Sequence, residues 1–194
     1  MTAVVTTYLE MTDRAKLRAK VSTDYRFRVH EATVRQWRLN RVLYELVGEA
    51  WSWQDKLTWT EAQWKAYVEG ENLRTFVAHY DGSLAGYFEL LAQERDVEIA
   101  YFGLAPEFIG KGFGGPLLSR ALEEAWSIGA QRVWVHTCTL DHPSALANYR
   151  ARGMVIYKEA IKVAEPADRA NDEERGHAVV PIESPRRAPR QGSS

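Results

Sequence analysis

A single acid in an apolar stretch, followed by a glycine-rich loop, is the part of this sequence best suited to chemistry. Glu98 lies in the run 97–104, whose other residues are aliphatic, aromatic or glycine. The glycine-rich loop consists of Gly110, Lys111, Gly112, Phe113, Gly114 and Gly115. It is followed by an amphipathic segment with helical periodicity. Backbone N–H groups at a helix N-terminus bind anions, so this loop indicates a phosphate-bearing ligand. An anion site beside a potential base points to a transferase.

Glu98 is the candidate general base. Strand alternation predicts that its side chain shares a face with that of Phe102. A carboxyl group in such apolar surroundings has a raised pKa and can accept a proton near neutral pH. The alternative is a glutamate at a strand edge that faces solvent or pairs with Arg95 or Arg132. Glu89, in the preceding strand-like run, is the reserve candidate for the base.

The glycine loop is also similar to two nucleotide-binding motifs, and the surrounding sequence decides between these alternatives. Residues 110–115 satisfy the dinucleotide pattern G-x-G-x-x-G, which is a weak signal alone. That pattern expects the loop after the first strand and an acid at the end of the second, whereas the next predicted strand ends in His136, Thr137 and Cys138. A P-loop is excluded because no Gly-Lys-Ser/Thr occurs at the required spacing. A glycine-rich turn that only reverses the chain remains the bland alternative.

Composition narrows the class of protein further. The chain has 194 residues and a formal net charge of −1, which argues against a nucleic-acid partner. No apolar run reaches the ~20 residues of a membrane helix, and the start lacks a signal-peptide pattern, so we expect a cytoplasmic protein without membrane association. The single Cys138 cannot form an internal disulfide. His136, Cys138, Asp141 and His142 fit no common zinc spacing, so no metal site is expected.

The order of predicted elements supports a mixed α/β (α+β) domain. Residues 1–24 form an N-terminal extension with a possible strand at 4–9, residues 25–163 form the domain, and residues 164–194 form a disordered tail. Thr33 and Thr60 are expected to cap helices, the latter in a capping box with Gln63. Strands are predicted at 25–30, 73–80, 84–91, 97–104, 132–138 and 154–157, with a continuation of the last one to 163 left open, and helices at 34–47, 60–67, 112–128 and 143–152.

The loop and the strand before it resemble the acyl-CoA site of the GNAT superfamily of N-acetyltransferases. Gly112 and Gly114 match the two small positions of that family's pattern, while Ile109 stands where Gln or Arg is usual. The resemblance implies a central mixed β-sheet flanked by helices, and acetyl-CoA as co-substrate. It also implies backbone N–H groups near Leu104 that polarise the acyl carbonyl. The cofactor-binding residues that it implies are Phe102, Gly103, Leu104, Gly110, Lys111, Gly112, Phe113, Gly114, Gly115 and His142.

A second signature of the same family is similar to residues 142–154. Ala145, Tyr149 and Gly153 match, whereas His142 replaces an Asn and Met154 a Phe. The resemblance implies that Tyr149 protonates the departing CoA thiolate, a reasonable step because a thiol of pKa ≈ 8.5 needs only a nearby O–H donor. The alternative is a core tyrosine on an amphipathic helix.

The sequence therefore predicts an N-acetyltransferase that moves acetyl from acetyl-CoA to a primary amine of a small molecule or peptide. Aromatic and acidic residues gather at 37–67, a composition that suits a cationic amine with an apolar body, and the loop from Trp51 to Trp59 is expected to touch it. The rivals are a non-catalytic acyl-CoA-binding sensor or scaffold and, more remotely, a nicotinamide dinucleotide binder. The oligomeric state stays open, with a homodimer as one option.

Overall fold

The computed structural model describes residues 3–51 and 53–163 of the chain. The tail predicted at 164–194 lies outside these residues. Within them, every element predicted between 25 and 163 is present, with boundaries shifted by a few residues at most. The capping box of Thr60 and Gln63 is formed, whereas Thr33 caps no helix because the first helix begins only after Gln36.

A seven-stranded mixed sheet forms the centre of the fold, in the order β2-β3-β4-β5-β6-β1-β7. Among the strands of residues 3–51 and 53–163, only β5 and β6 pair in parallel, and all other neighbours are antiparallel. The fold class predicted from the sequence, a mixed sheet flanked by helices, is confirmed. The strands are β1 Ala3–Met11, β2 Phe27–Glu31, β3 Leu73–Tyr80, β4 Ser83–Gln93, β5 Asp96–Leu104, β6 Arg132–Cys138 and β7 Val155–Val163.

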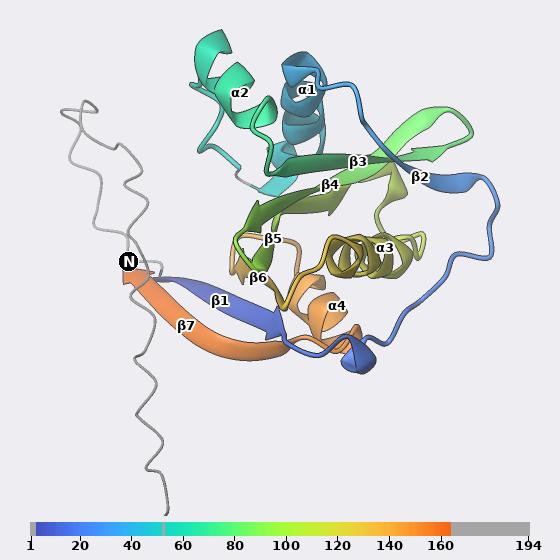
Figure 1. Cartoon of the computed structure of the whole chain (residues 1–194), viewed down its shortest axis with the longest axis vertical. Helices are drawn as coiled ribbons and strands as arrows, with labels where there is room; N and C mark the ends of the chain where they lie inside the picture. Colours follow the sequence, from blue (N-terminus) through green and yellow to red (C-terminus); the bar gives the residue numbers. More distant parts are fainter. Residues whose placement is uncertain (1–2, 52, 164–194) are drawn as a thin grey trace, which may run out of the picture. The chain divides into compact units, whose positions relative to one another are not determined.

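Helices cover both faces of the sheet (Figure 1). One pair, α1 (Trp37–Gly48) and α2 (Glu61–Val68), lies on one face, and α3 (Gly114–Ser127) with α4 (Ala145–Ala151) lies on the other. Three short 3-10 turns, η1 (Arg14–Lys16), η2 (Glu49–Trp51) and η3 (Pro106–Phe108), join these elements. Within the described ranges, no helix combines the length and apolarity needed to cross a bilayer.

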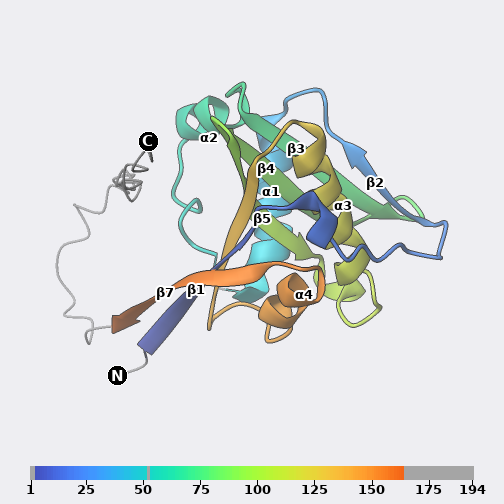
Figure 2. The same cartoon turned by 60° about the horizontal axis from the view of Figure 1, so that its bottom comes forward.

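Residues 3–11, within the segment expected as an N-terminal extension, form β1 inside the sheet. This strand lies between β6 and β7 and runs antiparallel to both. Figure 2 shows it in blue beside the orange β7. Leu9 and Met11 are buried in the core beneath the sheet. The start of the chain therefore completes the sheet between two strands that come from its second half.

The face of the sheet under α3 is an apolar core. Side chains of α3 recur at helical spacing and are fully buried against aliphatic residues of β5, β6 and β1. The α3 residues are Leu117, Leu118, Ala121, Leu122 and Ala125, and the strand residues are Val97, Ile99, Val133, Val135, Leu9 and Met11. This packing holds the start of α3, and with it the glycine loop, at a fixed place beside the sheet.

A β-bulge interrupts the pairing of β5 with β4. Leu90 pairs with Ile99, but Glu89, the preceding residue of β4, pairs with Tyr101. Ala100 is left without a partner on β4, so the alternation of side chains along β5 shifts by one residue at this point.

The bulge overturns the prediction that Glu98 and Phe102 share a face. Phe102 packs against Tyr149 of α4 and the core under α3, whereas Tyr101 contacts residues of α1 and its following loop. Glu98 precedes the bulge and alternates with the core residues Val97 and Ile99, so it faces α1 and α2. The prediction from alternation was wrong because it assumes a regular strand, whereas the bulge inserts one extra residue, Ala100, into β5.

Candidate active site

The parallel strands β5 and β6 separate after a short contact. They pair at three positions, of which the last joins Glu98 to Trp134. Beyond this point the described residues of the two strands, which continue to Leu104 and Cys138, form no further pair with each other. Backbone groups of β5 beyond Glu98 that face β6 therefore have no pairing partner on β6, and this point, where the two strands stop pairing, is called the opening below.

Glu98 lies at the start of this opening and is mostly buried. Its side chain is 13% exposed. Burial raises the pKa of the carboxyl group to about 7, and the positive charge of Lys56 acts in the opposite direction. Its neighbours are at long range: Gln93 Nε2 donates at 3.4 Å, and His136 Nδ1 lies 3.7 Å from a carboxylate oxygen. Such a group changes protonation near neutral pH, as a general base requires.

The alternative ion pair of Glu98 with an arginine is not formed. Arg132 donates to Glu10 at 2.6 Å and to Asp96 at 2.8 Å, while Arg95 contacts Gln131. The arginine pairs thus involve other carboxylates, which leaves Glu98 without a strong partner.

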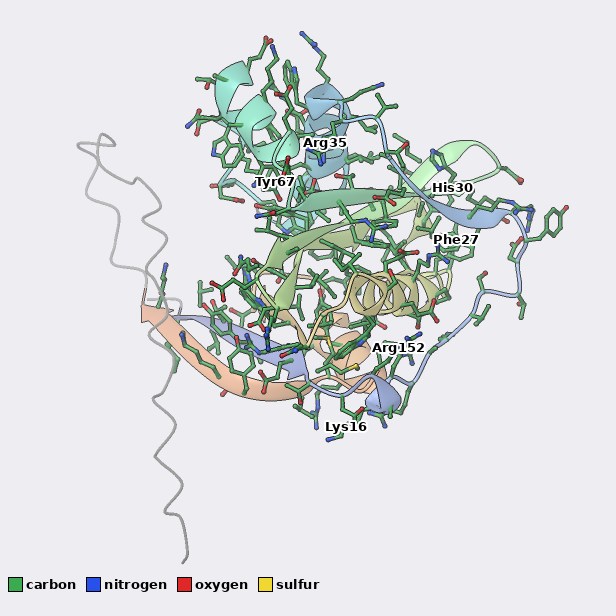
Figure 3. The ribbon with its side chains drawn as sticks, viewed as in Figure 1. Lys16, Phe27, His30, Arg35, Tyr67 and Arg152 are labelled. Carbon is green, nitrogen blue, oxygen red and sulfur yellow. The ribbon has the colours of Figure 1, made fainter. Side chains whose placement is uncertain are left out.

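Glu89, the reserve candidate, belongs to a closed hydrogen-bond network. Its side chain is 1% exposed and accepts from Asn40 Nδ2 at 2.8 Å and from the Tyr67 hydroxyl at 2.5 Å. Asn40 also donates to Thr75 at 2.7 Å. Figure 3 labels Tyr67, which lies between α2 and the sheet. A carboxylate held in this way ties α1 and α2 to the sheet, so Glu98 is the better placed of the two to meet a substrate.

Asp55 fixes the loop between α1 and α2 to the sheet. Its carboxylate accepts from the Tyr44 hydroxyl of α1 at 2.7 Å and from the Tyr101 hydroxyl of β5 at 2.5 Å. The Tyr44 oxygen in turn accepts from the backbone N–H of Lys56 at 3.3 Å. The residue after Asp55 is therefore held against the sheet on the same face as Glu98.

Lys56 is buried in a cage of aromatic rings that the sequence did not reveal. Its Nζ lies 4.0 Å from the ring centroid of Trp59, 3.5 Å from that of Tyr67 and 4.8 Å from that of Tyr101, and the residue is 5% exposed. Sequence reasoning assigned aromatic residues of this region to a cationic acceptor. In the structure, the cation that these three rings surround is the chain's own lysine.

The tryptophans of the 51–59 loop extend toward α4 and toward β5. The ring of Trp51 packs edge-on against His142 at 4.9 Å between centroids. Trp53 packs against Tyr101 and lies over Gly103, where a Cβ atom would collide with Val47. Gly103 thus allows α1 and the loop to approach the opening closely.

The glycine loop has the backbone conformation of an anion cradle. Gly110 and Gly112 have φ of +79° and +87°, a region that favours glycine, and the space around both is open. The helix α3 begins at Gly114 without a side-chain cap, and Pro116 in its first turn has no N–H to satisfy. N–H groups at this end of a 14-residue helix are available to an anionic ligand.

Neighbouring side chains hold the loop in place. Phe113 stacks on Phe27 of β2 at 4.5 Å between centroids, and Asn148 of α4 donates to the Gly114 carbonyl at 3.1 Å. Lys111 is exposed, with its Nζ 5.3 Å from the Phe108 ring centroid, so its charge can also reach a ligand in the loop.

Tyr149 lies on the other side of β5 from Glu98. It is 5% exposed, and its ring centroid is 5.9 Å from that of Phe102. Burial raises the pKa of its hydroxyl well above the usual range, with the charge of Asp141 acting in the same direction. Tyr149 therefore stays a protonated O–H donor at neutral pH, as a general acid must.

The residues considered for a metal have other roles. Asp141 accepts from the Thr137 hydroxyl at 2.7 Å and from the Cys138 N–H at 2.8 Å, and His142 Nδ1 accepts from the Ser144 N–H at 3.0 Å. In the part of the chain that the structure describes, no three His, Cys, Asp or Glu residues are grouped to hold a metal ion. His142 thus supports the start of α4 beside the opening.

Comparison with known proteins gives consistent matches. The sequence pattern described as the acetyltransferase (GNAT) family matches residues 32–154, well over half of the chain. An uncharacterized N-acetyltransferase of Mycobacterium bovis is 31% identical over 77 residues, which are 39% of this chain and 49% of that protein. The match thus spans about half the length of that relative.

Solved structures share the fold at low sequence identity. A GCN5-related N-acetyltransferase from Sphaerobacter thermophilus superposes with a TM-score of 0.64 at 14% identity, over 82% of this chain and 50% of that one. An aminoglycoside acetyltransferase from an uncultured soil metagenomic sample, solved with trehalose, gives 0.60 at 14% identity, over 75% and 99%. At this identity the likeness establishes the fold and leaves the substrate open.

Proposed function

This chain belongs to the acetyltransferase (GNAT) family, and we propose that it transfers an acetyl group from acetyl-CoA to a primary amine. The observation that carries the proposal is Glu98, a largely buried carboxyl group of pKa about 7 at the point where β5 and β6 separate. A base that ionises near neutral pH beside an opening in the sheet suits an amine acceptor, which must lose a proton to react.

The glycine loop supports binding of the donor. Open, left-handed backbone at Gly110 and Gly112 and the free N-terminus of α3 offer N–H groups to a pyrophosphate. Backbone N–H groups of β5 between the bulge and Leu104, unpaired on the β6 side, are available to the thioester carbonyl. These groups would stabilise negative charge as it develops on the carbonyl oxygen.

Proton transfer is divided between the two sides of β5. On the α1/α2 side, Glu98 takes the proton of the ammonium, directly or through a water. The nitrogen then forms a bond to the acyl carbon, its second proton passes to water, and the carbon–sulfur bond breaks. On the α3/α4 side, the Tyr149 hydroxyl donates its proton to the leaving thiolate and takes a proton back from solvent before the next turnover. Much of the rate gain comes from holding two reactants in register.

The test combines a binding and a transfer measurement on the full chain. Acetyl-CoA, CoA, NAD and ATP are titrated calorimetrically, and thiol release from acetyl-CoA is then followed with polyamines, amino acids, aminoglycosides and peptides as acceptors. Aminoglycosides are included because structural neighbours carry that name. The proposal expects binding of acetyl-CoA and CoA alone, and amine-dependent thiol release with at least one acceptor class.

Two other outcomes are informative. Binding of CoA without thiol release in the presence of any amine would favour the non-catalytic sensor. Ile109 and His142, which replace residues usual in the family, are consistent with that alternative. Binding of NAD in place of CoA would contradict the proposal and assign the glycine loop to a dinucleotide.

A further inference from the structure

We propose that Lys56 is a positioning residue for the proton transfer, whose caged ammonium acts through Glu98 and favours the ionised carboxylate. The inference rests on the proposed function, in which Glu98 is the base. It adds a residue that belongs to neither family signature and that sequence reasoning passed over.

The cage fixes the position of the charge. Three rings from three segments, Trp59 of the loop, Tyr67 of α2 and Tyr101 of β5, surround Nζ at 3.5–4.8 Å. Cation–π contacts hold an ammonium more strongly when it is desolvated, and Lys56 is 5% exposed. Among the residues that the structure describes, Lys56 Nζ forms no ion pair or hydrogen bond. Its charge therefore acts through space.

Three carboxyl groups share this charge, and they differ in how they are held. Glu89, Asp55 and Glu98 each favour the charged form of Lys56. Glu89 and Asp55 each accept two hydrogen bonds of 2.5–2.8 Å. Desolvation raises the pKa of the buried Glu89 in spite of these bonds. Glu98 has only a 3.4 Å contact with Gln93 and a 3.7 Å contact with His136, so the charge of Lys56 is what opposes its desolvation.

The other groups that face Glu98 add little opposing charge. His136 of β6 has a lowered pKa because it is desolvated, so its imidazole is neutral at pH 7. Tyr44 of α1, Tyr67 of α2 and Tyr101 of β5 have raised pKa values and are neutral as well. Gln93 of β4 is uncharged. Lys56, from the loop, is thus the cation that offsets the desolvation of Glu98.

The two pKa values approach each other. Desolvation raises the pKa of Glu98 to about 7 and lowers that of Lys56 to about 8. The carboxylate and ammonium forms therefore coexist near neutral pH, where each favours the other. Without Lys56, Glu98 would ionise at higher pH and would be a poorer base at pH 7.

The experiment measures the pKa of Glu98 in Lys56→Met by carbon NMR of labelled glutamate side chains, with the signal assigned by Glu98→Gln. Lys65→Met is the matched control, since it removes the same charge from a half-exposed lysine that pairs with Glu61. We expect an upward shift on the order of one pH unit in Lys56→Met and none in Lys65→Met. The acid limb of the pH profile of kcat/KM for the amine should shift upward by the same amount in Lys56→Met, so that kcat/KM at pH 7 falls roughly fivefold. Lys56→Arg, which keeps the positive charge, should restore both the profile and the activity.

The reciprocal measurement needs no substitution in the cage. Because coupling between two sites is mutual, Glu98→Gln should lower the pKa of Lys56 below its value in the unmodified chain, read from the lysine ε-carbon. An unchanged Lys56 pKa in Glu98→Gln, or an unchanged Glu98 pKa in a folded Lys56→Met, overturns the proposal. A fall in kcat with no shift of either pKa assigns Lys56 a purely structural role. These NMR titrations need no acceptor, so they stay decisive even if no amine is acetylated.

Discussion

The two faces of the sheet are built on opposite principles. Under α3 the strands present aliphatic side chains, and residues such as Leu117 and Leu122 are completely buried without any polar partner. Under α1 and α2 the same strands present Glu89, Thr75 and Glu98, covered by a buried lysine and a group of tyrosines and tryptophans. One face is a conventional core, whereas the other keeps ionisable groups out of water.

This difference separates stability from chemistry. Burial of apolar surface needs no particular geometry, so the α3 face can hold the glycine loop in place by packing alone. Buried polar groups require partners, and on the α1/α2 face Glu89 and Asp55 have them in full, while Glu98 has only distant ones. The carboxyl group left least satisfied is the one at the opening between β5 and β6.

The largest expected effect separates the faces by activity. Glu98→Gln should lower kcat/KM for acetyl transfer at pH 8 by about 10²–10⁴-fold, because it removes the base but keeps the side-chain size. Acetyl-CoA affinity, measured by calorimetry, should stay unchanged. Glu71→Gln, which alters an exposed glutamate, is the control. Full activity of Glu98→Gln would remove this residue from the mechanism.

Substitutions on the α3 face of the sheet should lower the free energy of unfolding and leave the pH dependence of activity unchanged. Leu117→Ala creates a cavity under a fully buried side chain, so we expect a loss of about 2–5 kcal/mol in the free energy of unfolding by urea. Leu57→Ala, at a half-exposed loop position, should change it by less than about 1 kcal/mol. The midpoint of the pH–activity profile should be the same in Leu117→Ala as in the unaltered chain. A shifted midpoint would show that the faces are not independent.

The buried carboxyl group should also make stability depend on pH. The pKa of Glu98 is higher in the folded chain, about 7, than its ordinary value of 4.5. The folded state therefore favours the protonated form, and the associated stability is present below pH 4.5 and lost as the pH rises through 7. Glu98→Gln should thus stabilise the protein at pH 8 by up to about 3 kcal/mol relative to its effect at pH 4. Equal effects of the substitution at the two pH values, in matched urea titrations, would contradict the raised pKa.

The smallest effect is expected at Tyr149. A CoA thiolate leaves readily because its thiol pKa is near 8.5, so Tyr149→Phe should reduce kcat only roughly tenfold, with KM for the amine unchanged. Stopped-flow detection of thiol release measures this directly. A loss as large as that of Glu98→Gln would mean that Tyr149 has a further role, whereas no loss would leave it as a core tyrosine packed on Phe102.

Local patterns predicted much of this molecule. The glycine loop, the apolar periodicity of α3 and the acid of β5 are each visible within about a dozen residues, because spacing alone determines which backbone groups and side chains come together. The same holds for the capping box at Thr60. The glycine loop is one of the two signatures by which the sequence resembles its family, and the other, at 142–154, is equally local.

The features that the sequence did not reveal depend on contacts between distant segments. The bulge at Ala100 follows from register with β4, and no local signal marks the residue that is skipped. The place of β1 between β6 and β7 depends on strands more than a hundred residues away. The cage of Lys56 combines rings from a loop, a helix and a strand. From the sequence alone, a lysine near tryptophans is indistinguishable from an ordinary surface lysine.

The most direct single measurement is the pH dependence of kcat/KM for acetyl transfer in the unaltered chain and in Glu98→Gln. If the polar face supplies the base, activity of the unaltered chain rises through one ionisation near pH 7 and levels off, and this ionisation is absent from the residual activity of Glu98→Gln. An identical limb in both proteins, or a flat profile in the unaltered chain, would show that a different group or the solvent takes the proton.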